Sequence, residues 1–330
     1  MVWRAKQSPR GRSDETSAAP DGSSGRRRMM VAAFLNAAAG SLAGRTIDEE
    51  VARVAEAFRA AGVEAEVRAV QGMRMAAAVR RAAASDADAV VVGGGDGTIS
   101  SAARALAGGE KPRGVLPLGT FNHFAKDLGV PLKLEDAVRV VAAGHVRTID
   151  VGEVNGRTFV NNSILGIYAG VVRAREMQRR RLGRDRWVAL FHAAVGALRR
   201  FPMLRLRVAG AAAGGGAWRR TAFVFVGNND YELPLYPSGG RAALERGRLS
   251  VYVATPSGRL ATVLMALRAL VGRPDSGRDL DRMLVPEVTI ESRKRRLRAL
   301  VDGEVVYMRP PLRYRVRPRA LRVLTPPPDG

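Results

Sequence analysis

The sequence of 330 residues contains no cysteine and only three scattered histidines, His123, His145 and His192. These absences exclude disulfides, thiolate nucleophiles and cysteine zinc sites, and they argue against a histidine metal cluster. Long apolar runs are lacking too, since the nearest one, at residues 260–271, is interrupted by Arg268 and a membrane-spanning helix needs about 20 such residues. Catalysis is therefore expected to rest mainly on carboxylates, in a soluble or peripheral protein.

Acidic residues are few beside basic ones, with 31 Asp and Glu against 54 Lys and Arg, a formal net charge of +23. This charge attracts polyanions such as nucleic acid, anionic lipid or nucleotide phosphates, and it does not choose among them. A genome-wide preference for arginine at solvent-exposed positions would give the same net charge without any functional meaning. Aromatic residues make up only 5%, and zinc-finger spacing and aromatic RNA-binding signatures are missing, so no specific nucleic-acid partner is expected.

Composition and periodicity divide the chain into three parts. Residues 1–28 are basic and almost without apolar side chains, which predicts a disordered basic tail. Residues 29–150 alternate strand-like and helical patterns, which predicts an α/β, three-layer domain with a parallel sheet. For the first helix, Thr46 and Glu49 form a capping-box pattern at the start and Gly62 suits the end. The expected strands are 31–35, 63–70 and 89–92, and the expected helices are 47–61, 73–84 and 98–107.

Residues 151–310 have the texture of a mainly β, sandwich-like second domain, because short alternating segments are separated by Gly and Asn turns. The segment 311–326 is expected to complete the first domain. Helical interruptions are expected near 187–200 and 260–271, and a hairpin loop at 214–216. The expected strands are 157–161, 204–208, 221–226, 248–254, 287–290 and 298–301.

A glycine-rich string follows the apolar run 90–92 and opens a helix: Gly93, Gly94, Gly95, Asp96, Gly97 and Thr98. This layout is typical of a phosphate site, where glycine lets phosphate oxygens approach backbone N–H groups and the helix dipole favours the anion. Asp96 is the carboxylate placed to meet a phosphate-bound Mg²⁺. The alternative is a tight turn whose aspartate caps a helix.

A second turn, after the β-like run 114–118, carries Gly119, Thr120 and Asn122. Gly119 permits close approach, and the hydroxyl of Thr120 and the amide of Asn122 are candidates for contacting a nucleotide. Threonine and asparagine are also ordinary helix caps, so an N-terminal cap is the alternative interpretation.

Together the two strings resemble the catalytic domain of the diacylglycerol kinase and sphingosine kinase superfamily, in its bacterial lipid kinase branch. Segments along roughly residues 30–326 extend the resemblance: 36–40, 159–170, 227–229, the triplet 302–304 and 320–326. The resemblance implies an ATP-dependent lipid kinase that uses ATP and Mg²⁺. It also places Asn36 and Gly40 in the nucleotide site, assigns Asp302 and Glu304 to catalysis, and makes Glu304 the general base for a lipid hydroxyl.

Three departures accompany the resemblance. His123 stands where the family has aspartate, Ser100 and Ser101 stand where it has an Asn-Glu pair, and Arg246 replaces the aspartate that helps to hold a structural Mg²⁺. The nucleotide and metal contacts are therefore expected to be weakened, and the structural Mg²⁺ site is expected to be absent.

Two other functions remain open. A soluble-substrate kinase of the NAD kinase or phosphofructokinase type shares the Gly-Gly-Asp-Gly-Thr loop, and a non-catalytic module that binds nucleotide or anionic membrane would suit the charge and the departures. For a lipid substrate, we expect a cytoplasmic protein, peripheral at the inner membrane face. Contact with the anionic membrane surface is predicted through the arginine-rich stretch 173–186 and the apolar segment 187–191. The oligomeric state stays open, with a homodimer as one possibility.

Overall fold

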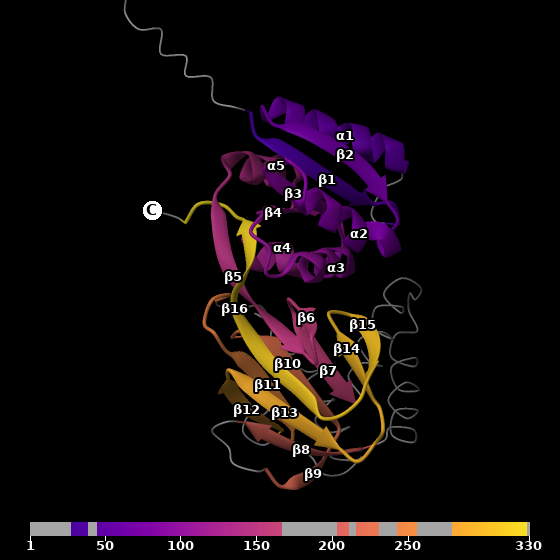
Figure 1. Ribbon diagram of the computed structural model, residues 1–330, viewed down its shortest axis with the longest axis vertical. Coiled ribbons are helices and arrows are strands. Elements are labelled where there is room, and N and C mark those ends of the chain that lie inside the picture. The colour runs from indigo at the N-terminus through magenta and orange to yellow at the C-terminus, as the bar shows by residue number, and fades with distance from the viewer. Residues whose placement is uncertain are drawn as a thin grey trace, which may run out of the picture.

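A computed structural model describes residues 28–38, 45–166, 203–210, 216–230, 243–255 and 279–328. Two domains are stacked along the long axis, and all the described helices lie in the N-terminal one (Figure 1). The predicted fold class, an α/β domain followed by a mainly β domain, is confirmed.

The first domain contains four parallel strands in the order β2-β1-β3-β4. The strands are β1 (Met30–Asn36), β2 (Glu64–Val70), β3 (Ala89–Gly94) and β4 (Arg113–Pro117). The helices are α1 (Ile47–Ala60), α2 (Gly72–Ala83), α3 (Asp96–Leu106), α4 (His123–Asp127) and α5 (Leu134–Ala143). The elements through α3 match the predicted order, and β4 corresponds to the expected β-like run 114–118.

Local sequence explains the helix ends. Thr46 Oγ1 accepts a hydrogen bond from Glu49 N, and the Glu49 carboxylate accepts one from Thr46 N, so the predicted capping box is confirmed. Gly62 follows α1 with φ +74°, the left-handed region that favours glycine. Helix α3 begins at Asp96, two residues earlier than predicted, because Gly95 is its N-cap.

Strands β1, β3 and β4 are buried on both faces, which explains their largely apolar runs, whereas the edge strand β2 has no buried residue. Alternate residues of β1 point to opposite sides. Ala33 and Leu35 join the core that α1 and α5 cover, whereas Ala32 and Phe34 join the core under α2. This sheet, with helices on both faces, gives the expected three layers.

The second domain is a sandwich of two sheets. One sheet has the antiparallel order β12-β11-β10-β7-β14-β15, and the other contains β16, β13, β8 and β9 in that order. Large buried side chains such as Leu206 and Tyr314 pack with Leu165 and Val226 between them. The strands are β6 (Arg157–Phe159), β7 (Asn162–Gly166), β8 (Leu204–Gly210), β9 (Trp218–Thr221), β10 (Phe223–Asn228), β11 (Leu249–Ala254), β12 (Leu280–Val285), β13 (Glu287–Ser292), β14 (Leu297–Val301), β15 (Glu304–Met308) and β16 (Leu312–Leu324).

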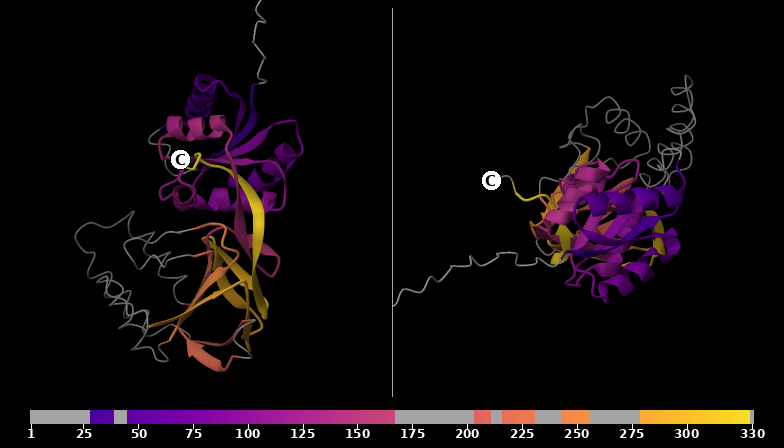
Figure 2. Two further views of the ribbon diagram at one scale, coloured as in Figure 1. Left: turned by 90° about the vertical axis from the view of Figure 1, so that its left-hand side faces the viewer. Right: turned by 90° about the horizontal axis from the view of Figure 1, so that it is seen from above.

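Two long strands join the domains. Strand β5 (Val146–Val154) pairs antiparallel with β16, and β16 also pairs with β4 at one end and β13 at the other. Both strands run from one domain into the other (Figure 2). The predicted boundary at residue 150 therefore falls inside β5, and β16 belongs to both domains and not to the first alone. A long strand has the same alternating pattern whichever domain it crosses, so composition did not mark this point.

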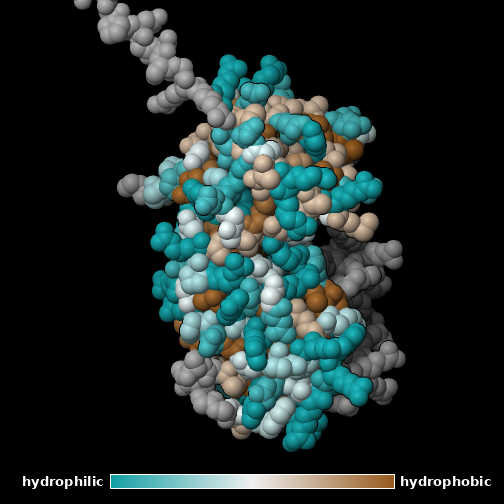
Figure 3. All heavy atoms as spheres, in the orientation of Figure 1, coloured by the Kyte–Doolittle hydropathy of each residue, from teal (hydrophilic) through white to brown (hydrophobic). Residues whose placement is uncertain are grey.

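Some expected features cannot be placed, and several elements were missed. The expected helical segments 187–200 and 260–271, most of the hairpin loop 214–216 and the tail 1–27 lie outside the described residues. The elements that were not expected include helix α5 and strands β5, β9 and β12. On the face shown in Figure 3, hydrophilic side chains dominate and apolar ones are scattered. Among the described residues, no helix is long and apolar enough to cross a membrane.

Candidate functional site

The two glycine-containing loops predicted to bind a nucleotide meet at one edge of the parallel sheet. Gly94 at the end of β3 lies in register with Pro117 at the end of β4, so the following loops are neighbours. Their backbones touch closely, because a Cβ added at Gly119 would lie 2.3 Å from the Cα of Gly95. The carboxyl edge of parallel strands is where α/β proteins bind ligands. The sheet therefore assembles the two strings into one candidate site.

The glycines of this edge serve two purposes. A Cβ at Gly93 would lie 2.5 Å from the Leu35 side chain, and one at Gly94 would lie 2.9 Å from Thr98 Cβ. At Gly97, which is exposed, a Cβ would meet nothing within 4 Å. Gly93, Gly94 and Gly119 are therefore needed for packing, whereas Gly97 opens to solvent.

Asp96 ties the two loops together. Its Oδ1 accepts a hydrogen bond from Phe124 N at 3.2 Å, and its Oδ2 has no partner among the described residues. A carboxylate oxygen at a helix N-terminus beside the open Gly97 fits a Mg²⁺ ion held mostly by nucleotide phosphates. The described residues contain no group of three or more Asp, Glu or His that could hold a metal ion by themselves, so this donor set fits only a nucleotide-borne ion.

Asn36 joins the same edge from the end of β1. Its Nδ2 donates to Thr98 Oγ1 at 2.7 Å, and its Oδ1 accepts from Ala38 N at 3.1 Å. The structure thus brings Asn36 and Thr98 together as the resemblance implies. Gly40, the other predicted residue of this turn, lies outside the described residues.

Asn122 has a different role from the one predicted. Its buried side chain accepts from Gly119 N at 2.9 Å and donates to Pro117 O and Gly119 O, at 3.1 and 2.9 Å. These bonds occupy both amide hydrogens, so the amide is not available to a nucleotide. Asn122 instead holds the second loop in shape, and its φ of +52° is one that asparagine tolerates. Thr120 is exposed at the same turn and stays a candidate.

Asp302, which was predicted to take part in catalysis, has a structural role in the fold. It is buried, and its carboxylate accepts from three backbone N–H groups, those of Val160, Asn161 and Asn162, at 2.8 to 3.0 Å. With Gly303 it forms the two-residue turn between β14 and β15, both residues having positive φ. A carboxylate saturated by backbone donors holds the turn that presents the next residue but one, Glu304.

Glu304 lies where the two domains meet, between two arginines from distant parts of the chain. Its Oε1 accepts from Arg104 Nη2 at 3.1 Å, and its Oε2 pairs with Arg157 on β6. The Glu304 side chain keeps 43% of its surface exposed. The predicted base is therefore accessible to a substrate while its carboxylate is held in place.

Sequence reasoning missed both arginines. Burial, and next the neighbouring Arg104, lower the pKa of the Arg157 guanidinium, against the opposing effect of Glu304. Arg104 Nη1 and Arg157 Nε are buried and have no hydrogen-bond partner among the described residues. The only local sequence feature that marked Arg157 was its position just after the turn at Asn155 and Gly156. In the sequence, Arg104 has no feature that distinguishes it from other helix arginines.

The residues that depart from the family pattern have distinct surroundings. His123 is exposed and stacks on Phe121, with ring centroids 5.6 Å apart. Ser100 is buried, and its Oγ has no hydrogen-bond partner in the part of the chain that the structure describes.

Two arginines surround the Asp230 carboxylate beside the loop that carries Arg246, where the family has a metal-holding aspartate. Arg248 makes two hydrogen bonds of 2.6 Å to the Asp230 carboxylate, and Arg246 Nε lies 3.3 Å from it. The hydrogen bond from Arg248 lowers the pKa of Asp230. Guanidinium groups thus neutralise this carboxylate, and the residues here do not fit a Mg²⁺ ion.

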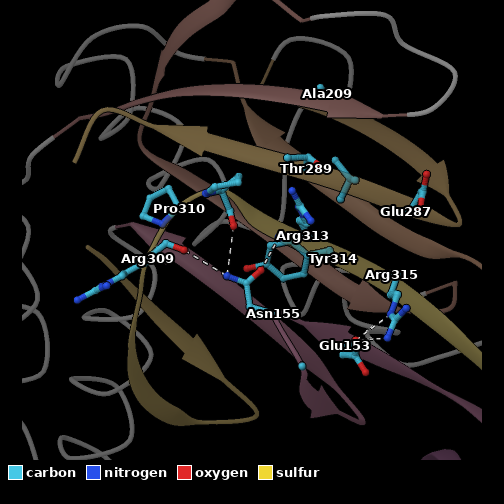
Figure 4. Close-up of a pocket in the computed structure, with 13 residues that line it drawn as sticks. Glu153, Asn155, Ala209, Glu287, Thr289, Arg309, Pro310, Arg313, Tyr314 and Arg315 are labelled. Atoms are coloured by element: carbon cyan, nitrogen blue, oxygen red, sulfur yellow. Dashed lines mark hydrogen bonds and ion pairs between the residues drawn. The ribbon is translucent and has the colours of Figure 1, made fainter. Parts of the chain in front are cut away.

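A separate hollow of about 850 Å³ lies on the second domain (Figure 4). Asn155 organises one side of it, by donating to Arg309 O and Pro311 O and accepting from Arg313 N. Arg315 and Glu153 pair on another side. None of the predicted site residues lines this hollow, so it is distinct from the candidate active site.

Residues 30–154 match the family model of the diacylglycerol kinase catalytic domain. A probable YegS-like lipid kinase of Pseudomonas fluorescens is 40% identical over 123 residues, 36% of this chain and 40% of that protein. The diacylglycerol kinase of Bacillus subtilis is 37% identical over 117 residues, 34% of this chain and 39% of that protein. The matched part thus spans about two fifths of these curated relatives.

Solved structures extend the likeness to the whole fold. A crystal structure of a Bacillus anthracis diacylglycerol kinase aligns with a TM-score of 0.65 at 19% identity, covering 91% of this chain and 97% of that one. A second, described as a putative diacylglycerol kinase, aligns with a TM-score of 0.68. The resemblance found in the sequence is confirmed: residues 30–154 match the diacylglycerol kinase catalytic domain, and the fold of the chain is that of the diacylglycerol kinase structures.

Proposed function

We propose that this protein transfers the γ-phosphoryl group of ATP to the hydroxyl of a lipid, with diacylglycerol or a related lipid alcohol as the acceptor. One observation carries the proposal: helix α3 begins at Asp96 in the glycine edge and reaches Glu304 through Arg104 in its last turns. The helix spans about 12 Å between Asp96 and Arg104, at 1.5 Å per residue. The predicted phosphate site and the predicted base are thus connected by one rigid element.

At the glycine edge, the exposed Gly97 and the N-terminus of α3 receive the phosphates of ATP. Asp96 would hold the Mg²⁺ that accompanies the nucleotide, and this ion supplies neutralisation of phosphate charge when bound. The pair of Asn36 and Thr98 fixes the first turn of α3 against the end of β1. Thr120 offers a hydroxyl from the second loop.

At the domain junction, Glu304 takes the proton of the acceptor hydroxyl. The hydroxyl oxygen forms a new bond to the γ-phosphorus as the bond from that phosphorus to the β-phosphate oxygen breaks, and ADP leaves. Asp302 positions the turn that carries Glu304. The accessible Glu304 side chain and its place between the domains support an acceptor that approaches from the second domain.

The acceptor class rests on the relatives, which are named as lipid kinases and diacylglycerol kinases. We propose that the protein reaches such lipids as a peripheral protein at the cytoplasmic membrane face. The exposed basic turn of Arg293, Lys294, Arg295 and Arg296 supports attraction to anionic lipid. The stretch 173–186, which was predicted to make this contact, lies outside the described residues.

A radiolabelled-ATP assay tests the proposal. Purified protein is incubated with labelled ATP, Mg²⁺ and mixed micelles that contain diacylglycerol, a long-chain base, ceramide or another lipid alcohol, and labelled lipid is separated by chromatography. Label in one lipid class, lost in Glu304→Gln and kept in Glu291→Gln, is the expected result; Glu291 is a matched control because it also pairs with an arginine, Arg207. Label transfer to a soluble alcohol alone would contradict a lipid acceptor.

A further inference from the structure

Buried polar atoms without partners gather on one side of the candidate site. In the described part of the chain, five buried side-chain atoms lack a hydrogen-bond partner, and three of them are Ser100 Oγ, Arg104 Nη1 and Arg157 Nε. Native proteins leave few such groups unsatisfied, and each one calls for an explanation such as a ligand or a water molecule. Three unsatisfied polar atoms close together indicate hydrogen-bond donors for a bound group.

Helix geometry aligns these atoms with the phosphate loop. Asp96, Ser100 and Arg104 are spaced four residues apart on α3, so they share one helix face. Arginine side chains on a helix lean back toward its N-terminus, which here means toward the glycine edge. The face thus forms a line from the phosphate loop to Glu304.

The hydrogen bonding on this line is incomplete. Among the described residues, Glu304 is the carboxylate that both guanidinium groups contact, while Asp302 acts on Arg157 through its charge, and the proximity of Arg104 disfavours the charged form of Arg157. A bound anion would complete the hydrogen bonding of both forks, and phosphate is the anion whose geometry a guanidinium fork matches best.

We propose that Arg104 and Arg157 form a clamp that binds the γ-phosphate of ATP. In the enzyme without ATP, the Glu304 carboxylate takes the place of this phosphate between the two guanidinium groups. This inference rests on the proposed function and adds the residues that receive the transferring group. When ATP binds, its terminal phosphate replaces the Glu304 carboxylate between the guanidinium groups. The exposed Glu304 side chain then turns to the acceptor hydroxyl, so the base is released only when a phosphoryl group is present.

The proposal predicts opposite effects of removing the anion and removing the cations. Glu304→Gln removes a competing charge and should tighten ATP binding by about twofold to fivefold, the scale of a partly exposed ion pair. Arg104→Gln and Arg157→Gln should each weaken ATP binding by about tenfold, the scale of a charge-assisted hydrogen bond. ADP lacks the terminal phosphate, so its affinity should be unchanged in all three variants.

The test is titration calorimetry of ATP and ADP with Mg²⁺ and without lipid, on the full-length protein. Arg219→Gln is the matched control, since Arg219 pairs with Asp281 on the far part of the second domain at similar exposure. Arg104→Lys and Arg157→Lys serve if a glutamine variant does not fold, because lysine keeps the charge and loses the fork.

The outcome is decided by how the ratio of ATP affinity to ADP affinity changes from the wild type to each variant. A ratio that rises in Glu304→Gln and falls in the arginine variants supports the clamp. A ratio equal to that of the wild type in the arginine variants overturns it, as does a weaker ATP affinity in Glu304→Gln. Lipid labelling by the wild-type protein is measured separately, so a failed clamp with intact labelling refutes only this inference, whereas failed labelling refutes the proposed function.

Discussion

The glycine edge and the domain junction are built in contrasting ways. At the glycine edge, the contacts join residues that are closer in sequence: Asn122 to Gly119 spans three residues, Asp96 to Phe124 spans 28, and Asn36 to Thr98 spans 62. At the junction, Glu304 contacts Arg104 and Arg157, which are 200 and 147 residues away. The first site therefore has a sequence signature, whereas the second exists only when β5 and β16 bring the domains together.

A second contrast lies within the junction itself. Asp302 and Glu304 are two residues apart and both carboxylates, yet one is saturated by backbone N–H groups and the other faces the arginines with an accessible side chain. Changing each carboxylate to a carboxamide should separate the two roles, because the change at Glu304 should affect turnover and the change at Asp302 should affect the free energy of unfolding. Four predictions follow this comparison from the largest effect to the smallest.

Glu304→Gln is expected to lower turnover by roughly 100-fold or more, the usual scale of general-base catalysis, while the free energy of unfolding stays near that of the wild type. The reason is that the variant keeps the shape of the side chain and loses the proton acceptor. Steady-state labelling of lipid, together with urea unfolding, measures both quantities. Wild-type turnover in this variant would remove Glu304 from the mechanism.

Asp96→Asn is expected to lower activity by roughly tenfold or more and to raise the Mg²⁺ concentration needed for half-maximal rate. The amide oxygen can still accept from Phe124 N, so the contact between the loops should survive. Rates measured across a Mg²⁺ titration test this point. If rate and Mg²⁺ dependence both matched the wild type, Asp96 would be only a link between the loops.

Asp302→Asn is expected to lower the free energy of unfolding by about 1–3 kcal/mol, because an amide NH₂ would face a backbone donor that the carboxylate satisfies now. Urea unfolding followed by circular dichroism gives the value. Glu304→Gln is the matched control, since it makes the same change on the exposed neighbour. Full stability with lost turnover in Asp302→Asn would return Asp302 to a catalytic role.

Mg²⁺ without nucleotide is expected to leave the Tm of the wild type unchanged, because Arg246 and Arg248 already neutralise Asp230. Arg246→Asp adds a second carboxylate there, and Mg²⁺ at about fivefold its Kd should then stabilise the variant by about 1 kcal/mol. Thermal unfolding with Mg²⁺ or with a chelator compares the two proteins. A Tm of the wild type that rises with Mg²⁺ in the absence of nucleotide would argue for an ion at this position.

Several features could be predicted because they depend on near neighbours. The capping box at Thr46, the left-handed Gly62 and the order of strands and helices through residue 106 all follow from local patterns of apolar, capping and glycine residues. The glycine edge was predictable for the same reason, since one strand, one turn and one helix N-terminus contain most of it.

The sequence could not assign roles to individual polar side chains. Asn122 and Asp302 were predicted as ligand-binding and catalytic residues, and both have their polar atoms engaged by backbone groups. Their residue types suit either role, because a carboxylate or an amide meets the same hydrogen-bonding needs in a turn as at a ligand.

The sequence by itself determined the fold class, the glycine-rich string with Asp96 and the likeness of residues 30–154 to the diacylglycerol kinase catalytic domain. Only the tertiary structure decided the domain connection through β5 and β16, and the pairing of Glu304 with Arg104 and Arg157. The physical reason is distance along the chain. Helices, caps and turns are specified by residues a few positions apart, whereas an ion pair between residues 147 or more positions apart depends on a fold that places them together.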